Sequence, residues 1–344
     1  MLDRMSSQET RTTAPSSADR TRQINWPYTS WLLAIHAVAL LALVPWFFSW
    51  AGVVSFFVCY YLFGTLGITV CLHRLLTHRS FACPLWLERT LSVLAAGTVQ
   101  DSPAYWVAVH RRHHNFSDRE RDPHSPELGL FWAHVGWLLV KTSDMQSGRM
   151  IARYAKDVMR DPFQTWMERN DNWFKLVLAS WAALYGLGLA GGLIAGKSLM
   201  ESVQLGLSIL VWGGALRIVY GWHAAWAVHS ICHRWGYRNY ETADNSRNNP
   251  LIGILANGEG WHNNHHADPA SARHGHKWYE FDLAWLSIRA LRGLGLASNV
   301  ALPSPTLAAK FNTGGPQLAS AAASRPDTDV SLAPRSSPPP PTIR

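Results

Sequence analysis

Four long apolar stretches alternate with polar segments along the chain, and each is long enough to cross a membrane. A helix of about 20 apolar residues crosses the hydrocarbon core of a bilayer. A short link around Ala51–Gly52 joins the first two stretches, and the link GKSLMES joins the last two. The pattern predicts two helical hairpins, with spans at about residues 30–50, 53–72, 174–195 and 203–228.

Single residues and shorter stretches refine this picture. Pro45 is expected to kink or end the first span, because proline has no N–H to donate to the helix. Arg217 lies within the fourth span, where a charge should face the protein interior or a wet cavity. The apolar stretches Leu91–Val99 and Leu128–Val140 are too short to cross a bilayer, so we expect interfacial or core helices there.

The two ends of the chain lack hydrophobic periodicity. Residues 1–25 are rich in Ser, Thr and Arg, and the chain becomes rich in Ala, Ser and Pro after about residue 303. Such compositions are typical of disordered segments. We therefore expect tails at residues 1–25 and 303–344 around one domain at residues 26–300.

Basic residues are distributed unevenly around the spans. The net charge is +8, yet Lys197 is the single Lys or Arg in the two hairpin links. Nearly all the others lie in the N-terminal tail, in the segment 73–172 and after residue 229. The positive-inside rule places such segments in the cytosol, so we expect both termini there. The same rule accounts for the positive charge, and binding to nucleic acid is not expected.

Histidine and tryptophan are unusually frequent, with 16 and 18 copies in 344 residues. Tryptophan favours membrane interfaces and histidine is the commonest metal ligand, so together they indicate a metalloprotein in a membrane. The first pair is His73 and His78, in HRLLTH at the end of the second span. On an ideal helix an offset of five residues separates side chains by about 140°, so both reach one metal cluster only if the helix unwinds or bends.

Two further groups share the pattern H-x-x-H-H. Offsets of three and four place the three imidazoles of such a group on one helical face. A single group could be a chance surface cluster, but two groups, each after a helical hairpin, predict metal binding. The groups are HRRHH, with His110, His113 and His114, and HNNHH, with His262, His265 and His266.

The remaining histidines have different expected roles. His229 and His233, in VHSICH at the end of the fourth span, are spaced to meet at one metal. The other expectations are hydrogen-bonded packing for His36, a core or tunnel-wall position for His223, a supporting or structural role for His124 and His134, and solvated loops for His274 and His276.

Nine or ten imidazoles exceed the roughly six ligands of one octahedral ion, so two metal ions are expected. All-imidazole ligation suits iron, copper or zinc. Carboxylates within the box segments are candidates to orient the ring N–H groups, namely Asp118, Asp122, Glu259 and Asp268. Candidates for tunnel or cap walls, or for interfacial anchors, are Trp106, Trp222, Trp226 and Trp261.

The motifs resemble those of the membrane fatty acid desaturases, of the stearoyl-CoA Δ9 type and the related acyl-lipid type. The resemblance rests on HRLLTH, on HRRHHNFSDRERDPHSP followed by HVGWLLVK, and on GEGWHNNHH, and covers roughly residues 27–295. It implies an all-α integral membrane protein, with four transmembrane helices in two hairpins and a cytosolic helical cap that holds a histidine-ligated di-metal site.

The same resemblance implies two iron ions, with O₂ as co-substrate. The implied ligands are His73, His78, His110, His113, His114, His233, His262, His265 and His266. His229 stands where relatives often have Asn, which leaves open whether it binds iron directly or through water.

The activity implied by the resemblance is insertion of a cis double bond, at Δ9, into a saturated C16–C18 acyl chain. The chain is carried as acyl-CoA or as a membrane acyl-lipid. The segment YWVAVHRRHH lacks the Arg-Asp pair of the animal acyl-CoA enzymes and is closer to bacterial and cyanobacterial members, which suggests a bacterial inner membrane. No HPGG-like segment of a fused cytochrome b5 occurs, so electrons are expected from a separate ferredoxin or from cytochrome b5 with its reductase.

Two other functions fit part of the pattern. A di-iron lipid or alkane hydroxylase shares the same plan, but the four-residue gap in HRLLTH and the GEGWHNNHH context favour the desaturase. A membrane metal transporter would place its polar groups near the bilayer midplane, whereas these boxes lie outside the spans and on one side.

Overall fold

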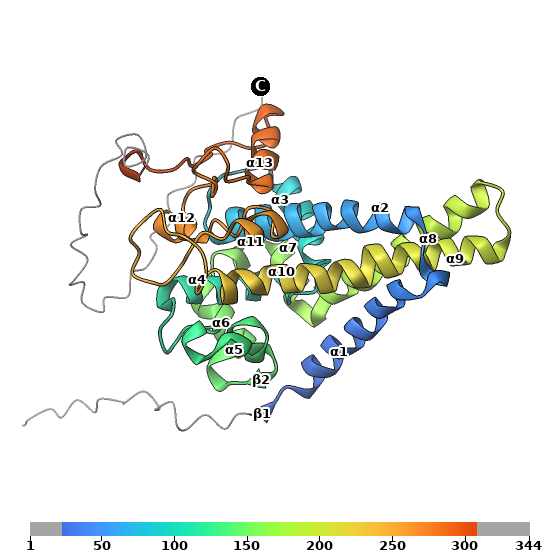
Figure 1. Cartoon of the computed structure of the whole chain (residues 1–344), viewed down its shortest axis with the longest axis horizontal. Coiled ribbons are helices and arrows are strands. Elements are labelled where there is room, and N and C mark those ends of the chain that lie inside the picture. Colours follow the sequence, from blue (N-terminus) through green and yellow to red (C-terminus); the bar gives the residue numbers. More distant parts are fainter. Residues whose placement is uncertain (1–22, 308–344) are drawn as a thin grey trace, which may run out of the picture.

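Four long apolar helices form the framework of the computed structural model, which describes residues 23–307 (Figure 1). By length and composition each can cross a membrane, and their bounds are Trp26–Leu43, Trp50–Thr77, Pro162–Ile194 and Leu199–Ile231. Short links join the first to the second and the third to the fourth. The predicted helical fold with four apolar helices is confirmed. Most of the tails predicted at residues 1–25 and 303–344 lies outside the described residues.

Each long helix is a series of smaller elements. The first span consists of α1 (Trp26–Leu40) and η2 (Leu41–Leu43), and the second of α2 (Trp50–Cys59) and η4 (Tyr60–Thr77). The third consists of α7 (Pro162–Glu168), η9 (Arg169–Asp171) and α8 (Asn172–Ile194), and the fourth of α9 (Leu199–Ile209), η10 (Leu210–Leu216) and α10 (Arg217–Ile231).

The first span begins and ends earlier than the predicted range 30–50. Pro45 opens a separate turn, η3 (Pro45–Phe47), and Val44 before it is extended, with φ −86° and ψ 123°. A residue that precedes proline is disfavoured in the helical region, so the helix ends before it. Ser49 then caps α2 by accepting the N–H of Gly52 at 2.9 Å, which restarts a helix in the opposite direction.

Small residues allow the two helices of the second hairpin to pack closely. A Cβ atom on Gly188 of α8 would lie 2.6 Å from the Cα atom of Gly206 in α9. Gly192 faces Ser202 in the same way, because a Cβ atom there would lie 2.8 Å from the Cα atom of Ser202. Close approach of backbones at small residues is typical of helices that pack within membranes.

Shorter elements gather at one end of the four helices and form a cap (Figure 1). Its helices are α3 (Leu85–Ala96), α4 (Pro103–Phe116), α5 (Leu130–His134), α6 (Ser147–Tyr154), α11 (Pro250–Leu255), α12 (His262–Ala267) and α13 (Leu283–Gly293). Single turns lie at η5 (Pro126–Leu128), η6 (Gly136–Leu138), η7 (Ser143–Met145) and η8 (Val158–Arg160). A two-residue pairing of β1 (Gln23–Ile24) with β2 (Val140–Lys141) ties the start of α1 to the cap.

Of the two short apolar stretches predicted to form helices, one does so and the other is divided. Leu91–Val99 begins in α3, where Leu91 and Ala95 are buried in the main core, as predicted for a core helix. Leu128–Val140 is not one helix, because it is divided into α5, η6 and the start of β2. The break falls at Val135, whose φ of −141° leaves the helical region.

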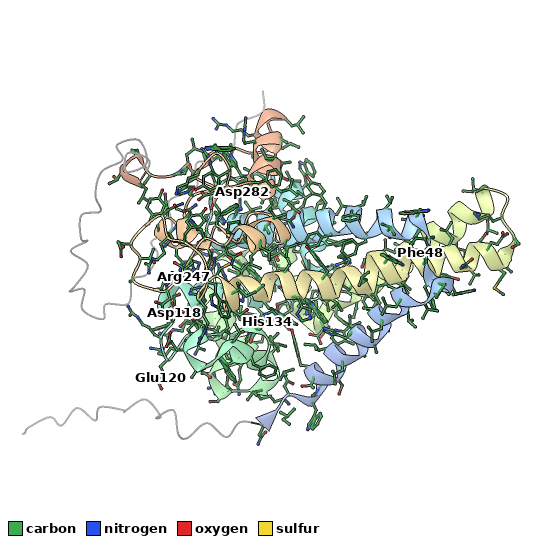
Figure 2. All side chains as sticks on the ribbon, in the orientation of Figure 1. Phe48, Asp118, Glu120, His134, Arg247 and Asp282 are labelled. Atoms are coloured by element: carbon green, nitrogen blue, oxygen red, sulfur yellow. The ribbon has the colours of Figure 1, made fainter. Side chains whose placement is uncertain are left out.

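Arg217 faces the protein interior, as predicted. Its Nε–H donates to the carbonyl of Gly213 at 3.0 Å and one NH₂ group donates to the carbonyl of Gly97 at 2.7 Å. Gly97 is the residue that follows α3, so the guanidinium lies at the negative end of that helix. Figure 2 labels the charged residues Asp118, Glu120, Arg247 and Asp282 in the cap, whereas Phe48 lies at the opposite end of the bundle.

Candidate metal centre

Two clusters of histidines come together where the cap meets the bundle. Within each cluster every residue offers one ring nitrogen, and these nitrogens all lie within 4.8 Å of one another. All three boxes contribute to the first cluster, whereas the second takes one residue from HRRHH and two from HNNHH. Site 1 is formed by His73, His78, His110, His114 and His265, and site 2 by His113, His233, His262 and His266.

The five-residue offset of His73 and His78 is accommodated by a widened helix. The N–H of His78 donates to the carbonyl of His73 at 3.1 Å, and the hydroxyl of Thr77 donates to the carbonyl of Leu72 at 2.7 Å. A backbone hydrogen bond between residues five apart, such as that of His78 with His73, defines a π-type turn, in which such residues lie over one another. The ring centroids of His73 and His78 are consequently 5.0 Å apart. The helix widens here, whereas the sequence predicted that it unwinds or bends.

Helix α4 supplies both sites from one face. His110 and His114 point to site 1, and their Nε2 atoms are 3.0 Å apart. His113, between them in sequence, belongs to site 2. Pro103 begins the helix and Ser102 caps it by accepting the N–H of Tyr105 at 3.2 Å, which fixes where each histidine lies around the axis.

Helix α12 is the counterpart of α4 on the other side of the sites. The Nε2 atom of His265 lies 3.0 Å from that of His73 and 2.9 Å from that of His114. The Nε2 atoms of His262 and His233 are 3.0 Å apart. Two imidazoles bound at right angles, each about 2.1 Å from one ion, have nitrogens about 3 Å apart, so these separations fit shared metal ligation.

Carboxylates fix the orientation of four of these rings. A carboxylate only accepts hydrogen bonds, so the Nδ1 atom that faces it carries the proton and Nε2 keeps its lone pair for a metal. The pairs are His73 with Glu259 at 2.5 Å, His113 with Asp122 at 3.0 Å, His233 with Asp118 at 3.0 Å and His266 with Asp244 at 2.6 Å.

Three of these four carboxylates, Asp118, Asp122 and Glu259, are among the candidates that the sequence predicts. Asp244 was missed, because it lies in the loop after the fourth span, where no periodic pattern or motif marks it. Asp268, the fourth candidate to orient a ring, instead accepts the backbone N–H of Ser304 at 2.8 Å. Burial alone would raise the pKa of Asp118, but the hydrogen bond and charge of His233 hold that pKa below its ordinary value.

The ring nitrogens that face the sites are suited to metal binding. Burial, and after it the repulsion of neighbouring imidazoles, lowers the pKa of His110, His114 and His265 well below the ordinary value. These rings are therefore neutral, which is the form that binds metals. The Nε2 atoms of His78, His113 and His266 are buried and have no hydrogen-bond partner in the described part of the chain. Orphaned buried nitrogens of this kind fit two metal ions.

His229 lies beside site 2 and outside the set of four converging nitrogens. Its ring centroid is 6.0 Å from that of His113. The ring stacks on His124 with centroids 3.8 Å apart. Its Nδ1 atom is buried without a hydrogen-bond partner in the described residues.

The prediction of a solvated loop for His274 was wrong. This residue is 1% exposed, and its ring centroid lies 4.5 Å from that of His265. The loop folds back onto HNNHH because the side-chain amide of Asn264 donates to the carbonyl of His274 at 2.8 Å. His276 is half-buried and pairs with the hydroxyl of Tyr240 at 2.8 Å.

A chain of three histidines lies apart from both sites. His36 of α1 and His223 of α10 have their Nε2 atoms 3.2 Å apart, and His223 Nδ1 lies 2.9 Å from His134 Nε2. The chain continues from His134 to the hydroxyl of Ser230 at 3.0 Å. These contacts link α1, α5 and α10, which gives the three histidines a structural role.

Comparison with known proteins identifies the family. Residues 48–297 match the family described as fatty acid desaturase. The chain belongs to this family. It is 40% identical over 280 residues to the sn-1 stearoyl-lipid 9-desaturase of Anabaena variabilis, a match that covers 81% of this chain and 95% of the relative.

Desaturases named for other positions of the double bond are nearly as similar to this chain as the Anabaena enzyme is. The icosanoyl-CoA 5-desaturase of Limnanthes douglasii is 39% identical over 274 residues, which is 79% of this chain and 71% of the relative. The palmitoyl-monogalactosyldiacylglycerol delta-7 desaturase of Arabidopsis thaliana is 38% identical over 274 residues, or 79% and 68% of the two chains. The protein is therefore a fatty acid or lipid desaturase, an oxidoreductase of the membrane with four candidate spans.

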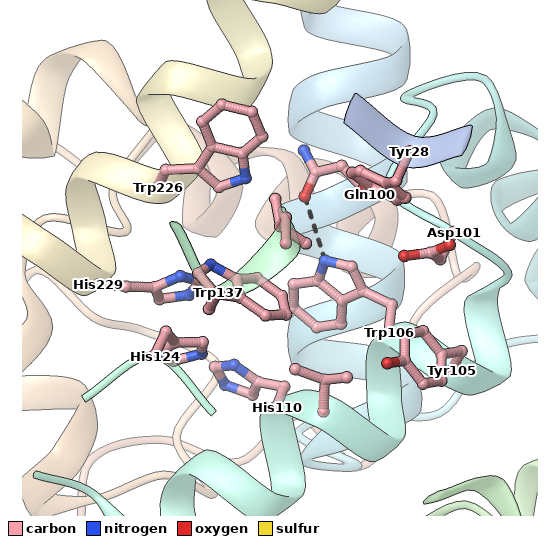
Figure 3. Close-up of a pocket in the computed structure, with 12 residues that line it drawn as sticks. Tyr28, Gln100, Asp101, Tyr105, Trp106, His110, His124, Trp137, Trp226 and His229 are labelled. Carbon is pink, nitrogen blue, oxygen red and sulfur yellow. Dashed lines mark hydrogen bonds between the residues drawn. The ribbon is translucent and has the colours of Figure 1, made fainter. Parts of the chain in front are cut away.

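A largely apolar pocket of the desaturase lies against site 1 and beside site 2 (Figure 3). His110 of site 1 lines it, together with the stacked pair His124 and His229 beside site 2. At the other end of the pocket lie Tyr28 from α1 and Asp101 from the loop before α4.

Tryptophans form part of the pocket wall, as predicted for two of the four candidates. Trp106 and Trp226 line the pocket, and the indole N–H of Trp106 donates to the side-chain oxygen of Gln100 at 3.2 Å (Figure 3). Trp222 and Trp261 are buried elsewhere and donate to backbone carbonyls, of Thr98 at 3.0 Å and of Phe281 at 2.8 Å. A straight apolar chain suits a wall of this composition.

Proposed function

We propose that this desaturase inserts a cis double bond at Δ9 into a saturated C16–C18 acyl chain of a membrane lipid, with two iron ions and O₂. The observation that carries the proposal is the pocket, because a residue of site 1 and the stacked pair beside site 2 line the same apolar space. An acyl chain in that space would lie beside His110 of site 1 and beside the pair His124 and His229. The proposed iron ligands are His73, His78, His110, His113, His114, His233, His262, His265 and His266, with His229 as a candidate tenth.

Iron bound by these imidazoles would supply the activation of O₂. Over the whole reaction the acyl chain loses two hydrogens, and O₂ with two electrons and two protons becomes two molecules of water. The electrons come from a separate donor, which we propose to be a ferredoxin or cytochrome b5 with its reductase. We place both termini and the cap in the cytosol, because most Lys and Arg residues flank that side of the spans. The similarity to the Anabaena relative supports a bacterial membrane.

The protein's own residues position the acyl chain and exclude water. Trp106 is held by Gln100 and so presents a fixed wall near His110. Its indole stacks on the imidazole of His110, with ring centroids 5.0 Å apart. Fixing which carbons lie beside the metal sites is a proximity effect, and small displacements of such a wall change reactivity strongly.

The charge at the pocket favours an acyl-lipid over an acyl-CoA. Among the residues that line the pocket, Asp101 carries the one carboxyl group and none is Lys or Arg. Burial, with a smaller contribution from Glu168, raises the pKa of Asp101 to about 7. A pocket wall without a basic residue offers nothing that would bind the several phosphates of CoA. The lipid-linked Anabaena relative supports the same choice and the Δ9 position.

Expression in a host that lacks desaturases tests this proposal. Fatty acids are released from separated lipid classes, and the double bond is located by mass spectrometry of derivatised products. We expect Δ9 monounsaturated C16 and C18 chains in intact glycerolipids, and none from the variant His113→Ala. Double bonds at Δ5 or Δ7, products found first on acyl-CoA, or hydroxylated chains would each contradict part of the proposal.

A further inference from the structure

His274 is a fully buried imidazole for which the reaction described above has no role. It lies in the loop between α12 and α13, and neither of its ring nitrogens has a hydrogen-bond partner in the described residues. A neutral imidazole has one donor and one acceptor, and leaving such a group buried and unpaired costs about 1–3 kcal/mol. The residues around His274 should therefore explain why an unpaired imidazole is buried there.

Two side chains, Asn264 and Asp282, hold the backbone of His274. Its N–H donates to a carboxylate oxygen of Asp282 at 2.8 Å, and its carbonyl accepts from Asn264 at 2.8 Å. Asn264 belongs to HNNHH. Asp282 accepts from both terminal nitrogens of Arg74, at 3.1 and 2.9 Å, and Arg74 belongs to HRLLTH. The position of His274 is therefore set by the segments that supply site 1.

The imidazole of His274 shares a carboxylate with His73. The Nδ1 atom of His274 lies 3.6 Å from Glu259 Oε2, the oxygen that accepts from Nδ1 of His73 at 2.5 Å. The other oxygen of Glu259 has a distant partner, a terminal nitrogen of Arg74 at 3.4 Å. Glu259 is itself buried, so it needs further donors to compensate for lost hydration.

We propose that His274 is a positioning residue for site 1, which donates its Nδ1–H to Glu259 and thereby holds this carboxylate on His73. The inference rests on the proposed metal role of His73. An N–H···O hydrogen bond is about 2.9–3.0 Å long, so a movement of about 0.6 Å closes the contact. The Nε2 atom is then free to accept from an ordered water. Glu259 gains a second donor and can no longer rotate away from His73.

His274 acts through Glu259 and not as a ligand of site 1. Its nitrogen lies within 4.8 Å of the ligand atoms of His73 and Glu259, but it is not part of the set formed by the five imidazoles. Partners of this kind behind a metal ligand typically change metal affinity by 10–100-fold. Because Glu259 contacts His73 of site 1, the loss of affinity should be confined to one of the two ions.

Three variants of the full-length protein test the inference. His274→Leu removes the donor, whereas His274→Asn keeps an N–H group at the position of Nδ1. His276→Asn is the matched control, because His276 lies in the same loop and bonds to Tyr240. Purified proteins are titrated with Fe²⁺ and challenged with a chelator, and Mössbauer spectra of ⁵⁷Fe-loaded samples resolve the two iron environments.

We expect His274→Leu to weaken the binding of one of the two ions by about 10–100-fold and to shift one spectral component. His274→Asn and His276→Asn should bind both ions as the parent does. Parent-like affinity and spectrum in His274→Leu would overturn the inference, as would equal weakening of both ions. The readout is affinity for metal at site 1. If the parent holds a metal other than iron, the iron assignment fails, and the same comparison with that metal still decides the role of His274.

Discussion

His124 and His229 stack face to face, with ring centroids 3.8 Å apart and ring planes 5° from parallel. Burial, and next the neighbouring ring of His229, hold the pKa of His124 well below its ordinary value. Two charged imidazoles would repel at this distance, so His124 is neutral. The pair lies between site 2 and the pocket, and therefore borders both the proposed metal ligands and the proposed acyl site.

Substitution of His229 separates a role at site 2 from simple packing. Site 2 has four converging imidazoles, one fewer than site 1, and His229 lies one helical turn before His233. We expect His229→Asn to preserve much of the activity, because an amide can hold a water on the metal. His229→Leu should lower activity by about 10–100-fold, since an apolar group offers that water no hydrogen bond. Product fraction in whole cells measures both, and parent-like activity of His229→Leu would exclude a role at the metal.

Metal content tests the division of the histidines into two sites. We expect two irons per chain in active protein, because nine imidazoles converge in two separate groups. Substituting His265 by Ala should abolish product formation while the protein still inserts into the membrane, since this ring faces both His73 and His114. Glu120→Gln, at an exposed acid of the cap, is the control. One metal per chain at full activity, or zinc as the active metal, would contradict the assignment.

The carboxylates behind the rings should matter for metal retention. Asp122 is fully buried beside His113 and accepts its Nδ1–H at 3.0 Å. Asp122→Asn keeps the volume but presents an amide in place of a full charge, so we expect about 10–100-fold weaker metal binding at site 2. Metal affinity measured by competition with a chelator checks this. Unchanged affinity at site 2 would show that the charge of Asp122 does not support metal binding.

Local patterns in the sequence predict the spans and the boxes, because apolar length and histidine spacing are properties of neighbouring residues. They do not predict how the boxes divide between two ions. His110 and His113 share a helical face, yet they belong to different sites, and the division depends on where α12 and the end of η4 lie against α4. Asp244 and His274 were not predicted because they reach the sites from loops, whose path is set by tertiary contacts such as that of Asn264 with His274.

Packing of the second hairpin should respond sharply to one methyl group. A Cβ atom on Gly188 would lie 2.6 Å from the backbone of Gly206, so the two helices must move apart to accept Gly188→Ala. We expect a loss of about 1–3 kcal/mol in the free energy of unfolding. Gly191 lies on the same helix, and a Cβ atom there would meet no neighbour within 4 Å among the described residues, so Gly191→Ala should be neutral or slightly stabilising. Thermal unfolding in detergent compares the two, and equal stability would contradict the close packing.

Asp101 should make the stability of the desaturase depend on pH. Its pKa is raised to about 7 by burial and by Glu168, from an ordinary value of 3.8. Between these values the folded protein holds a proton that the unfolded chain has lost, so this residue lowers stability progressively as pH rises from about 4 to about 7. Above pH 7 the cost is constant, and below pH 4 it vanishes.

The variant Asp101→Asn has no such proton to hold. We therefore expect it to be more stable than the parent at pH 8, with an advantage that shrinks as the pH is lowered towards 5. Comparing the two proteins at each pH cancels the titration of all other groups, which both share. Glu120→Gln, an exposed acid that does not line the pocket, serves as the control and should show no such trend. Thermal unfolding at several pH values measures the difference, and an advantage that is constant from pH 5 to pH 8 would show that Asp101 titrates normally.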